Sequence, residues 1–434
     1  MFSVRNVARR LAALVSPGPP RPPSPPRAPS TATFLTIDPS QPIEEETLPH
    51  YDPNNFYPVR MGEVFQARYQ VVGKLGYGAY STVWLCRDLV GHRYVTVKVC
   101  TRNAIPVKRE LAALEHLNRL PWTMHGGRPH IRTLLDQFVL TFTSAEGPPA
   151  SSVSETPGSE SAPGPQSFQC LVHKPMLMSI SALRDFLRGN KLDEQLAKLV
   201  LIHVLTALDY LHSKAKLIHT DINEHNILLD LDDAPTLAAF EEAERTDPLP
   251  RKDAGGGRTI YLSRALETAP EHYGKPVLCD FGEARIGLAT KHTGLIQPDQ
   301  YRAPEVVLGV PWDEKVDIWT VGVLIWDMFE GKNMFRPYGG PEDKRDDLYH
   351  LAHMVALLGP PPADFLARCT MAELGQFFDK QGKETLSETI LEGEDKALFL
   401  AFVRKMVRWD PGERASAKEL LRDPWLNTFK PRQS

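Results

Sequence analysis

IHTDINEHNILL, residues 218–229, sets His219, Asp221 and Asn226 between an apolar helical run and the apolar residues 227–229. An aspartate followed five residues later by an asparagine fits phosphoryl transfer, where the carboxylate orients a hydroxyl and the amide holds a metal ion. Alone, the pattern fits a solvated turn between a helix and a hairpin equally well. Its interpretation therefore depends on the rest of the chain.

The composition is that of a globular protein. The chain has 434 residues, 42% of them hydrophobic, enough to bury a sizeable core in two lobes with tails. Its formal charge is -4, so no global electrostatic argument favours nucleic acid or an anionic membrane. The five cysteines show no CxxC spacing, which fits a reduced intracellular compartment. No apolar run is long enough to cross a bilayer, so we expect no membrane span.

The N-terminal region has a composition of its own. Residues 1–37 contain no Asp, Glu or Lys but carry arginines among apolar residues, a pattern typical of an amphipathic mitochondrial transit segment. The alternative is a disordered basic tail, because residues 17–29 are too rich in proline to fold. We predict a disordered extension over residues 1–40. Residues 41–68 are acidic and then aromatic, which suggests a strap packed on the first lobe.

From Tyr69 the pattern changes to strand alternation, which leads into GYGAYSTV at residues 76–83. Glycines in a strand-turn-strand segment let the backbone close over phosphates, because no side chain obstructs the amide groups. Ser81 stands where the commoner GxGxxG pattern has its third glycine. Taken alone, a short glycine pattern is more typical of an ordinary turn.

A lysine and a glutamate follow this hairpin. RYVTVKVC, residues 93–100, alternates between two faces and puts Lys98 on the inner face, where an ammonium needs an anionic partner. Pro106 and Val107 open a helical pattern whose inner face includes Glu110, which predicts a Lys98–Glu110 ion pair. Each residue alone is more typical of an exposed position. Their order after a glycine-rich hairpin favours the pair.

A low-complexity segment interrupts the first lobe. Residues 143–167 are rich in Ser, Pro, Gly and Glu, so we predict a disordered loop between two strands. FQCLVHKPM, residues 168–176, then fits an apolar strand. In isolation it is compatible with an ordinary core strand.

Together, these motifs resemble those of the eukaryotic protein kinases, in the same order. The series is GYGAYSTV, VTVK with Lys98, Glu110, HTDINEHN, DFG at 280–282 and APE at 303–305. Within that superfamily the chain looks most like the SR-protein kinases in a fungal form, over roughly residues 44–429. The resemblance implies an α+β fold of two lobes. The small β-rich lobe would cover residues 69–178 with one main helix, and the α-helical lobe residues 179–430 with an insert at about 231–275.

The resemblance also implies roles for individual residues. Asp221 would accept the proton of the substrate hydroxyl, Lys98 and Glu110 would form the catalytic ion pair, and Asn226 and Asp280 would hold Mg²⁺. Glu305 would pair with Arg414, and Asp317 would bond the backbone of the catalytic loop. Residues 174–176 would form the hinge whose backbone pairs with adenine. The implied ATP contacts are Leu75, Gly76, Tyr77, Gly78, Ala79, Tyr80, Ser81, Thr82, Val83, Thr96, Lys98, Lys174 and Met176.

Two positions of the catalytic loop depart from the common kinase pattern. Thr220 stands where most kinases have an arginine, so no cation waits there for an activation-loop phosphate, and we expect activity without loop phosphorylation. The SR-protein kinases share this threonine. Asn223 replaces a lysine that touches the transferred phosphate, a loss of about 2–4 kcal/mol of transition-state stabilisation if nothing compensates. This puts turnover in doubt.

The expected activity is that of a serine/threonine protein kinase acting on Arg/Ser-rich proteins such as splicing factors. Asp347 aligns best with the acidic groove that SR-protein kinases use, although a carboxylate at a helix start has the same pattern. The alternatives are a pseudokinase scaffold and a small-molecule kinase of the aminoglycoside or choline type. We expect a monomer that does not bind nucleic acid directly. Family resemblance places it in the cytoplasm and nucleus, and the N-terminus offers the mitochondrion as the alternative.

Overall fold

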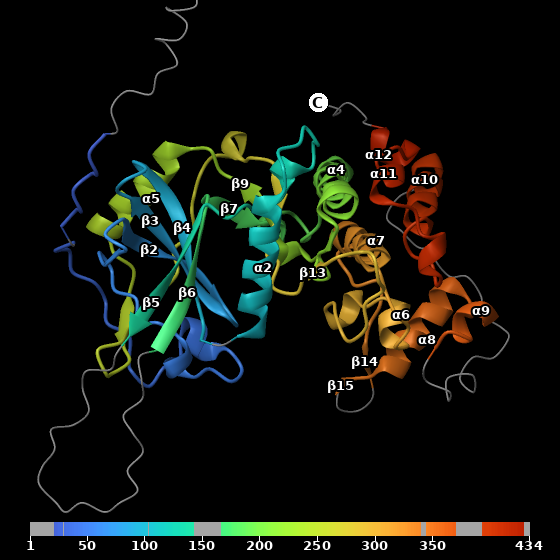
Figure 1. The fold of residues 1–434 in the computed structure, drawn as a ribbon, viewed down its shortest axis with the longest axis horizontal. Coiled ribbons are helices and arrows are strands. Elements are labelled where there is room, and N and C mark those ends of the chain that lie inside the picture. Colours follow the sequence, from blue (N-terminus) through green and yellow to red (C-terminus); the bar gives the residue numbers. More distant parts are fainter. Residues whose placement is uncertain are drawn as a thin grey trace, which may run out of the picture.

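The computed structural model describes residues 21–28, 30–102, 104–142, 166–339, 344–369 and 393–428. Within these ranges the chain forms a small lobe built on an antiparallel sheet and a larger lobe built mainly from helices (Figure 1). The predicted α+β architecture of two lobes is confirmed.

The small lobe is a twisted sheet with one long helix against it. Val95, Val97 and Val99 lie in the core on one face of the sheet, and Lys98 lies on the other face, as the alternation predicted. Helix α2, Ile105–Arg119, packs on the Lys98 face (Figure 1). The strands, in sheet order, are β1 Val64–Phe65, β2 Tyr69–Gly78, β3 Ser81–Asp88, β4 Arg93–Cys100, β6 Gln166–His173 and β5 Asp136–Phe142.

Helix α7 forms the centre of the large lobe, since every residue from Val316 to Glu330 is buried. Gly322 is required there, because a Cβ would lie 2.7 Å from the Val407 side chain. The helices of this lobe are α3 Ile180–Asp185, α4 Glu194–Tyr210, α6 Pro304–Val307, α7 Lys315–Glu330, α8 Asp347–Leu358, α9 Ala363–Leu366, α10 Gly393–Arg404, α11 Ala417–Leu420 and α12 Pro424–Asn427. Its short strands are β7 Met176–Ser179, β8 Leu217–Ile218, β9 Ile227–Asp230, β12 Pro276–Leu278, β13 Arg285–Ile286, β14 Tyr338–Gly339 and β15 Lys344–Arg345.

Within the described part of the chain, one segment has the length and hydropathy of a membrane span. It runs over Glu194–Ala215, which is α4 with the turn that follows, and 56% of its apolar window is buried. Helix α4 contacts α7, α11 and β12 inside the large lobe. This burial is what a core helix of a globular lobe requires, so we assign the segment to the core.

The N-terminal segment corrects one prediction. Residues 21–40, apart from Pro29, are part of the described structure and lie along the small lobe, whereas disorder was expected over 1–40. The amide of Ser24 donates to the carbonyl of Leu89 (2.8 Å), and the Gln70 side chain bonds both backbone groups of Arg27. An extended proline-rich chain is thus held by hydrogen bonds from its backbone to the small lobe instead of by a fold of its own. Residues 1–20 lie outside the described residues, as do 143–165 of the predicted loop.

The contacts of the strap, residues 41–68, explain why it is rich in acidic and aromatic residues. The ring of Tyr57 contacts the rings of Phe65, Phe142 and Phe168 on the core face of the sheet. Glu44 and Glu45 both pair with Lys74, a fully buried lysine of β2. Buried charges require partners of this kind. The acidic residues therefore neutralise a cation that would otherwise lie unpaired in the small lobe.

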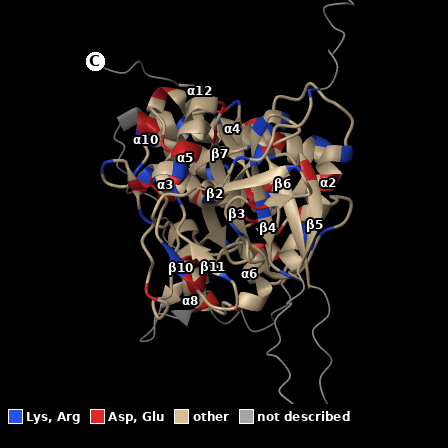
Figure 2. Ribbon diagram, turned by 90° about the vertical axis from the view of Figure 1, so that its left-hand side faces the viewer, with Lys and Arg blue, Asp and Glu red and all other residues tan. Residues whose placement is uncertain are grey.

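The insert at about 231–275 belongs to the large lobe in chain order but lies against the small lobe (Figure 1). It contains α5 Ala234–Thr246, β10 Arg251–Asp253 and β11 Thr259–Tyr261. A Cβ on Gly73 of β2 would lie 2.6 Å from the ring of Phe240, so α5 packs directly on the strand. The acidic positions of α5, marked red in Figure 2, face basic groups: Glu244 pairs with Arg264 and Glu241 with Arg27.

Candidate active site

The catalytic loop is held by one buried carboxylate of α7. Asp317, which is fully buried, accepts hydrogen bonds from the amides of His219 (2.9 Å) and Thr220 (2.8 Å). The predicted contact between Asp317 and the loop backbone is therefore confirmed. Thr220 has a φ of 66°, a left-handed conformation that costs energy outside glycine and needs such support. These bonds fix the loop rigidly at the point where its functional side chains emerge.

Three side chains of the loop form one cluster. The Asp221 carboxylate accepts from Nδ2 of Asn223 at Oδ1 (3.0 Å) and from Nδ2 of Asn226 at Oδ2 (2.9 Å). Burial raises the pKa of Asp221, and the negative charge of Asp280 acts in the same direction. The cluster holds a carboxylate in a fixed orientation and keeps it more basic than an ordinary aspartate.

Lys98 is surrounded by two carboxylates. Its Nζ lies 2.7 Å from Oε2 of Glu110 on α2 and 3.6 Å from Oδ2 of Asp280. Burial acts to lower the pKa of Lys98, but the charges of Asp280 and Glu110 outweigh it, so the pKa is raised and the lysine stays cationic. The charge of Lys98 in turn lowers the pKa of Asp280. The predicted Lys98–Glu110 ion pair is present, and the structure adds Asp280 to it.

The oxygen atoms of the Asn226 amide and the Asp280 carboxylate are suitable ligands for a hard divalent cation. Asn226 uses its Nδ2 to donate to Asp221, which leaves its Oδ1 without a hydrogen-bond donor among the described residues. Asp280 is anionic because the positive charge of Lys98 lowers its pKa. Carboxylate and amide oxygens are the ligands that Mg²⁺ prefers. The two predicted metal ligands therefore have the right chemistry and protonation for the ion.

The glycine-rich hairpin has no side chains at Gly76 and Gly78. A Cβ at Gly76 or Gly78 would meet no atom within 4 Å, so open space lies beside the backbone amides. Val83 is the cross-strand neighbour of Lys98 and shares its face. Thr82 points to the opposite face, where its Oγ1 accepts from Nε1 of Trp84 (2.9 Å). Strand alternation turns the Thr82 side chain away from Lys98, so the predicted ATP contact at Thr82 would have to come from its backbone.

The remaining predicted contacts lie where the lobes join. Thr96 is buried on β4, while Leu75, Tyr77, Ala79, Tyr80 and Ser81 belong to the β2–β3 hairpin. Lys174 directs its ammonium to Asp230 (3.0 Å), and Met176 lies in the strand pair β7–β9. The pairing of the backbone at these two positions with adenine stays a prediction. The predicted residues thus lie on the β2–β3 hairpin, on β4 and on the segment that links β6 to β7.

One link in the site had no signal in the sequence. Arg109 of α2 pairs with Glu283, the residue after DFG (2.7 Å), and Thr220 Oγ1 donates to the carbonyl of Glu283 (2.5 Å). The helix that carries Glu110 is therefore tied to the start of the activation segment and to the catalytic loop.

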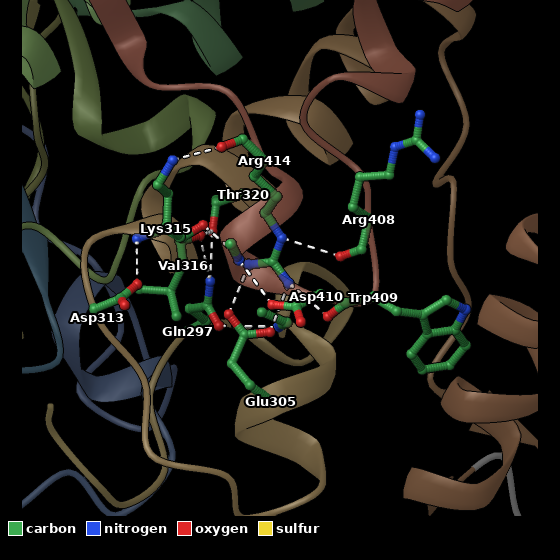
Figure 3. Close-up of polar contacts among 12 residues, drawn as sticks. Gln297, Glu305, Asp313, Lys315, Val316, Thr320, Arg408, Trp409, Asp410 and Arg414 are labelled. Atoms are coloured by element: carbon green, nitrogen blue, oxygen red, sulfur yellow. Dashed lines mark hydrogen bonds and ion pairs between the residues drawn. The ribbon is translucent and has the colours of Figure 1, made fainter. Parts of the chain in front are cut away.

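A second buried ion pair supports the segment after APE. Glu305 and Arg414 are joined by two parallel hydrogen bonds of 2.6 and 2.7 Å, as the resemblance implied (Figure 3). Gln297 lies beside them and bonds the amide of Ala303. This network fixes α6, and with it the end of the activation segment, on α7.

Comparison with known proteins agrees with this geometry. The model of the protein kinase domain matches residues 69–426, most of the chain, so the chain belongs to the protein kinase family. A serine/threonine protein kinase of Aspergillus fumigatus is 44% identical, over 95% of this chain and 96% of that protein. The serine/threonine-protein kinase SRPK of Physarum polycephalum is 28% identical, over 89% and 92%. SRSF protein kinase 3 of Homo sapiens is 24% identical, over 88% and 90%.

These matches confirm the resemblance to SR-protein kinases in a fungal form. The protein is a protein serine/threonine kinase, whose substrate is a protein and whose domain implies ATP and a divalent metal. The family match sets aside a small-molecule kinase of the aminoglycoside or choline type.

Proposed function

We propose that this kinase transfers the γ-phosphate of ATP to serine or threonine of Arg/Ser-rich proteins such as splicing factors. The observation that carries the catalytic part is the fixed and basic Asp221 carboxylate, close enough to Asp280 for their charges to interact. The substrate class is supported by the names of two relatives, a kinase called SRPK and an SRSF protein kinase.

In this proposal each residue of the cluster has one task. Asp221 accepts the proton of the substrate hydroxyl, and Lys98, kept in place by Glu110, binds the phosphates of ATP. Asp280 and Asn226 would hold Mg²⁺, which when bound would neutralise negative charge on the phosphates. The amides of Gly76–Gly78 lie over the phosphates, and the backbone of Lys174 and Met176 pairs with adenine.

The acidic start of α8 supports recognition of arginine. Asp346 and Asp347 are both exposed there, and the Asp346 side chain caps the helix by accepting from the amide of Leu348. Asp347 is the candidate for a guanidinium of the substrate, because it aligns best with the acidic groove that SR-protein kinases use. Its carboxylate also lies in the first turn, where the helix dipole favours it, so a test must separate the two roles.

The catalytic test uses the full-length protein, Mg-ATP and an Arg-Ser peptide, with incorporation of labelled phosphate as the readout. Asp221→Ala is expected to lower incorporation by about 10²–10⁴-fold, the usual contribution of a general base. Asp232→Ala is the matched control, because that carboxylate is 98% exposed and lies outside the cluster. Equal incorporation by wild type and Asp221→Ala would refute the proposal.

The pseudokinase alternative rests on Asn223, a neutral side chain that donates to Asp221 and offers no charge to phosphate. It predicts that the wild type incorporates no labelled phosphate and that the Asn223→Lys variant does so in the same assay. Our proposal predicts that the wild type is already active.

The substrate test replaces every arginine of the peptide by glutamine. We expect the kcat/KM of wild type to fall by at least tenfold, and Asp347→Ala to raise KM for the Arg-Ser peptide at unchanged kcat. Asp364 is an exposed acidic residue in the first turn of α9. Asp364→Ala is therefore the control for the loss of a carboxylate that only interacts with a helix dipole. Equal rates with both peptides would exclude Arg/Ser-rich substrates.

We further propose a monomer located in the cytoplasm and nucleus, on the strength of the family resemblance. A protein tagged at its C-terminus and imaged in cells tests the location, and a mitochondrial signal would support the transit-segment alternative. Light scattering tests the oligomeric state.

A further inference from the structure

Ser24 lies on the outside of the small lobe, in the N-terminal segment that runs along the sheet (Figure 1). Its hydroxyl forms a solvent-exposed hydrogen bond of 2.8 Å with Nδ1 of His92, in the turn between β3 and β4. Its amide donates to the carbonyl of Leu89 in the same turn. Pro23 and Pro25 stand on either side of it. The hydroxyl is therefore held at a defined place on the surface, in an extended chain that an enzyme can reach.

Basic side chains gather around this hydroxyl. A hollow of about 610 Å³ between the N-terminal segment, the β3–β4 turn and the start of α5 is lined by Ser24 together with Arg21, Arg27, His92 and Arg93. Residues 21, 24 and 27 are three apart, which is the period of an extended proline-rich helix, so they can share one side of the segment. Four groups that can donate hydrogen bonds to an anion thus line the same hollow as one serine hydroxyl.

Arg21 and Arg93 are available to a new anion. Arg21 is exposed and forms no ion pair with any other residue that the structure describes. Arg93 is 53% exposed and lies 3.6 Å from Asp88. Arg68 already neutralises that carboxylate with two hydrogen bonds of 2.8 and 2.9 Å. Arg93 can therefore turn to another partner without leaving a buried charge unpaired.

The other acidic side chains of the hollow have partners of their own. Asp232 is 98% exposed and lies 4.0 Å from the ammonium of Lys174. Asp233 accepts a hydrogen bond from the hydroxyl of Thr236. Both come from the residues just before α5, whereas Arg93 begins β4. The hollow is thus most basic beside the β3–β4 turn, where the hydroxyl of Ser24 lies.

A phosphate on Ser24 would match these surroundings. It would add about two negative charges and three acceptor oxygens, for which arginine is a strong partner. We propose that Ser24 is a phosphorylation site and that Arg21, His92 and Arg93 bind its phosphate, which fastens the N-terminal segment to the small lobe.

The phosphoryl donor is ATP, and the enzyme is a serine/threonine kinase that accepts proline after serine. The hydroxyl of Ser24 loses its proton, and its oxygen forms a bond to the γ-phosphorus. The bond from that phosphorus to the bridging oxygen breaks, which releases ADP.

Ser40 provides a contrast within the same segment. Its hydroxyl and its amide both donate to the carboxylate of Asp38, at 2.7 and 2.8 Å. A phosphate at this position would face a like charge and could not donate as the hydroxyl does. Ser40 is exposed, so it can be modified without disturbing the core. It is therefore the matched control position.

The first test determines whether the modification occurs. The full-length protein is isolated from cells that express it, in the presence of phosphatase inhibitors, and its peptides are sequenced by mass spectrometry. Phosphate on Ser24 is expected. Recovery of the Ser24 peptide only in its unmodified form would overturn the proposal.

The second test measures how firmly the segment is held. Phosphoserine is placed at position 24 of the full-length protein during translation, and hydrogen exchange is followed at the amides of residues 24–28. The phosphate is expected to slow this exchange by about 3–10-fold, the effect of a few exposed charged hydrogen bonds. In Arg21→Gln/Arg93→Gln the slowing should fall below about twofold. Arg188→Gln, which removes an exposed arginine of the large lobe, should keep it.

The direct effect of a phosphate on the exchange of nearby amides is the same in all these variants, so it cancels in the comparison. Equal slowing in wild type and in Arg21→Gln/Arg93→Gln would overturn the proposal, as would equal slowing by phosphoserine at position 40. Arg93→Gln alone serves if the double variant does not fold. Neither test involves turnover by this protein, so failure here would leave the proposed kinase activity intact.

Discussion

The pair Glu305–Arg414 allows a prediction whose size follows from the structure (Figure 3). Both side chains are 0% exposed, and Arg414 also donates to the carbonyls of Arg408 and Lys315, each at 3.0 Å. Arg414→Met removes the cation at similar length and leaves the Glu305 carboxylate buried without a partner. Breaking a buried pair in this way costs about 3–5 kcal/mol of unfolding free energy. With a urea m-value of ~2–3 kcal/mol/M, the midpoint should fall by about 1–2.5 M.

Tryptophan fluorescence can follow this unfolding, because the guanidinium of Arg414 lies 5.0 Å from the centre of the Trp319 ring. Arg408→Met is the matched control: that side chain is exposed, and its loss should change stability by no more than about 0.5 kcal/mol. The double variant Glu305→Gln/Arg414→Met should recover part of the loss, since it no longer buries a lone charge. A cost below about 1 kcal/mol for Arg414→Met, or no recovery in the double variant, would refute the reasoning.

Three further predictions concern turnover. Lys98→Met should lower kcat/KM by about 10²–10³-fold in the labelled-phosphate assay, because the phosphates of ATP lose a fixed cation. A loss of less than about tenfold would contradict the role of Lys98 in binding these phosphates. Burial raises the pKa of Asp221 above its ordinary 3.8. A general base acts only when it is ionised, so the rate should begin to fall with decreasing pH at a value above pH 3.8. A fall that occurs only at or below pH 3.8 would show that Asp221 is not the base. Thr290→Ala and Thr293→Ala should change kcat less than about twofold, because Arg109 and Thr220 hold the start of the activation segment through Glu283. A large loss in the same assay would point to loop phosphorylation.

The parts of the fold that could be predicted from the sequence are those with a local period or a fixed chemical spacing. Strand alternation in residues 93–100 correctly assigned Lys98 and its neighbouring valines to opposite faces. The helical spacing after Pro106 correctly turned Glu110 toward Lys98. Both patterns are short-range, since one strand or one helix turn decides which way a side chain points.

The parts that could not be predicted depend on contacts between distant segments. Lys74 donates to the carbonyl of Tyr261, 187 residues later, and pairs with Glu45 of the strap. No period or motif links these three positions, and Lys74 alone is typical of an exposed strand residue. The same holds for α5, whose packing on Gly73 becomes visible only when the strand and the insert are seen together.

Asn223 shows how a departure from a motif changes with its surroundings. In the sequence it is a missing cation. In the structure its Nδ2 donates to Oδ1 of Asp221 while its Oδ1 accepts from the amide of His225, so it fixes both the carboxylate and the turn that follows. Orientation of the base is thereby retained, whereas neutralisation of the transferred phosphate is left to Lys98 and the metal. Because charge stabilisation is the larger share of phosphoryl-transfer catalysis, we expect a kinase whose substrate is well placed but whose chemical step is slow.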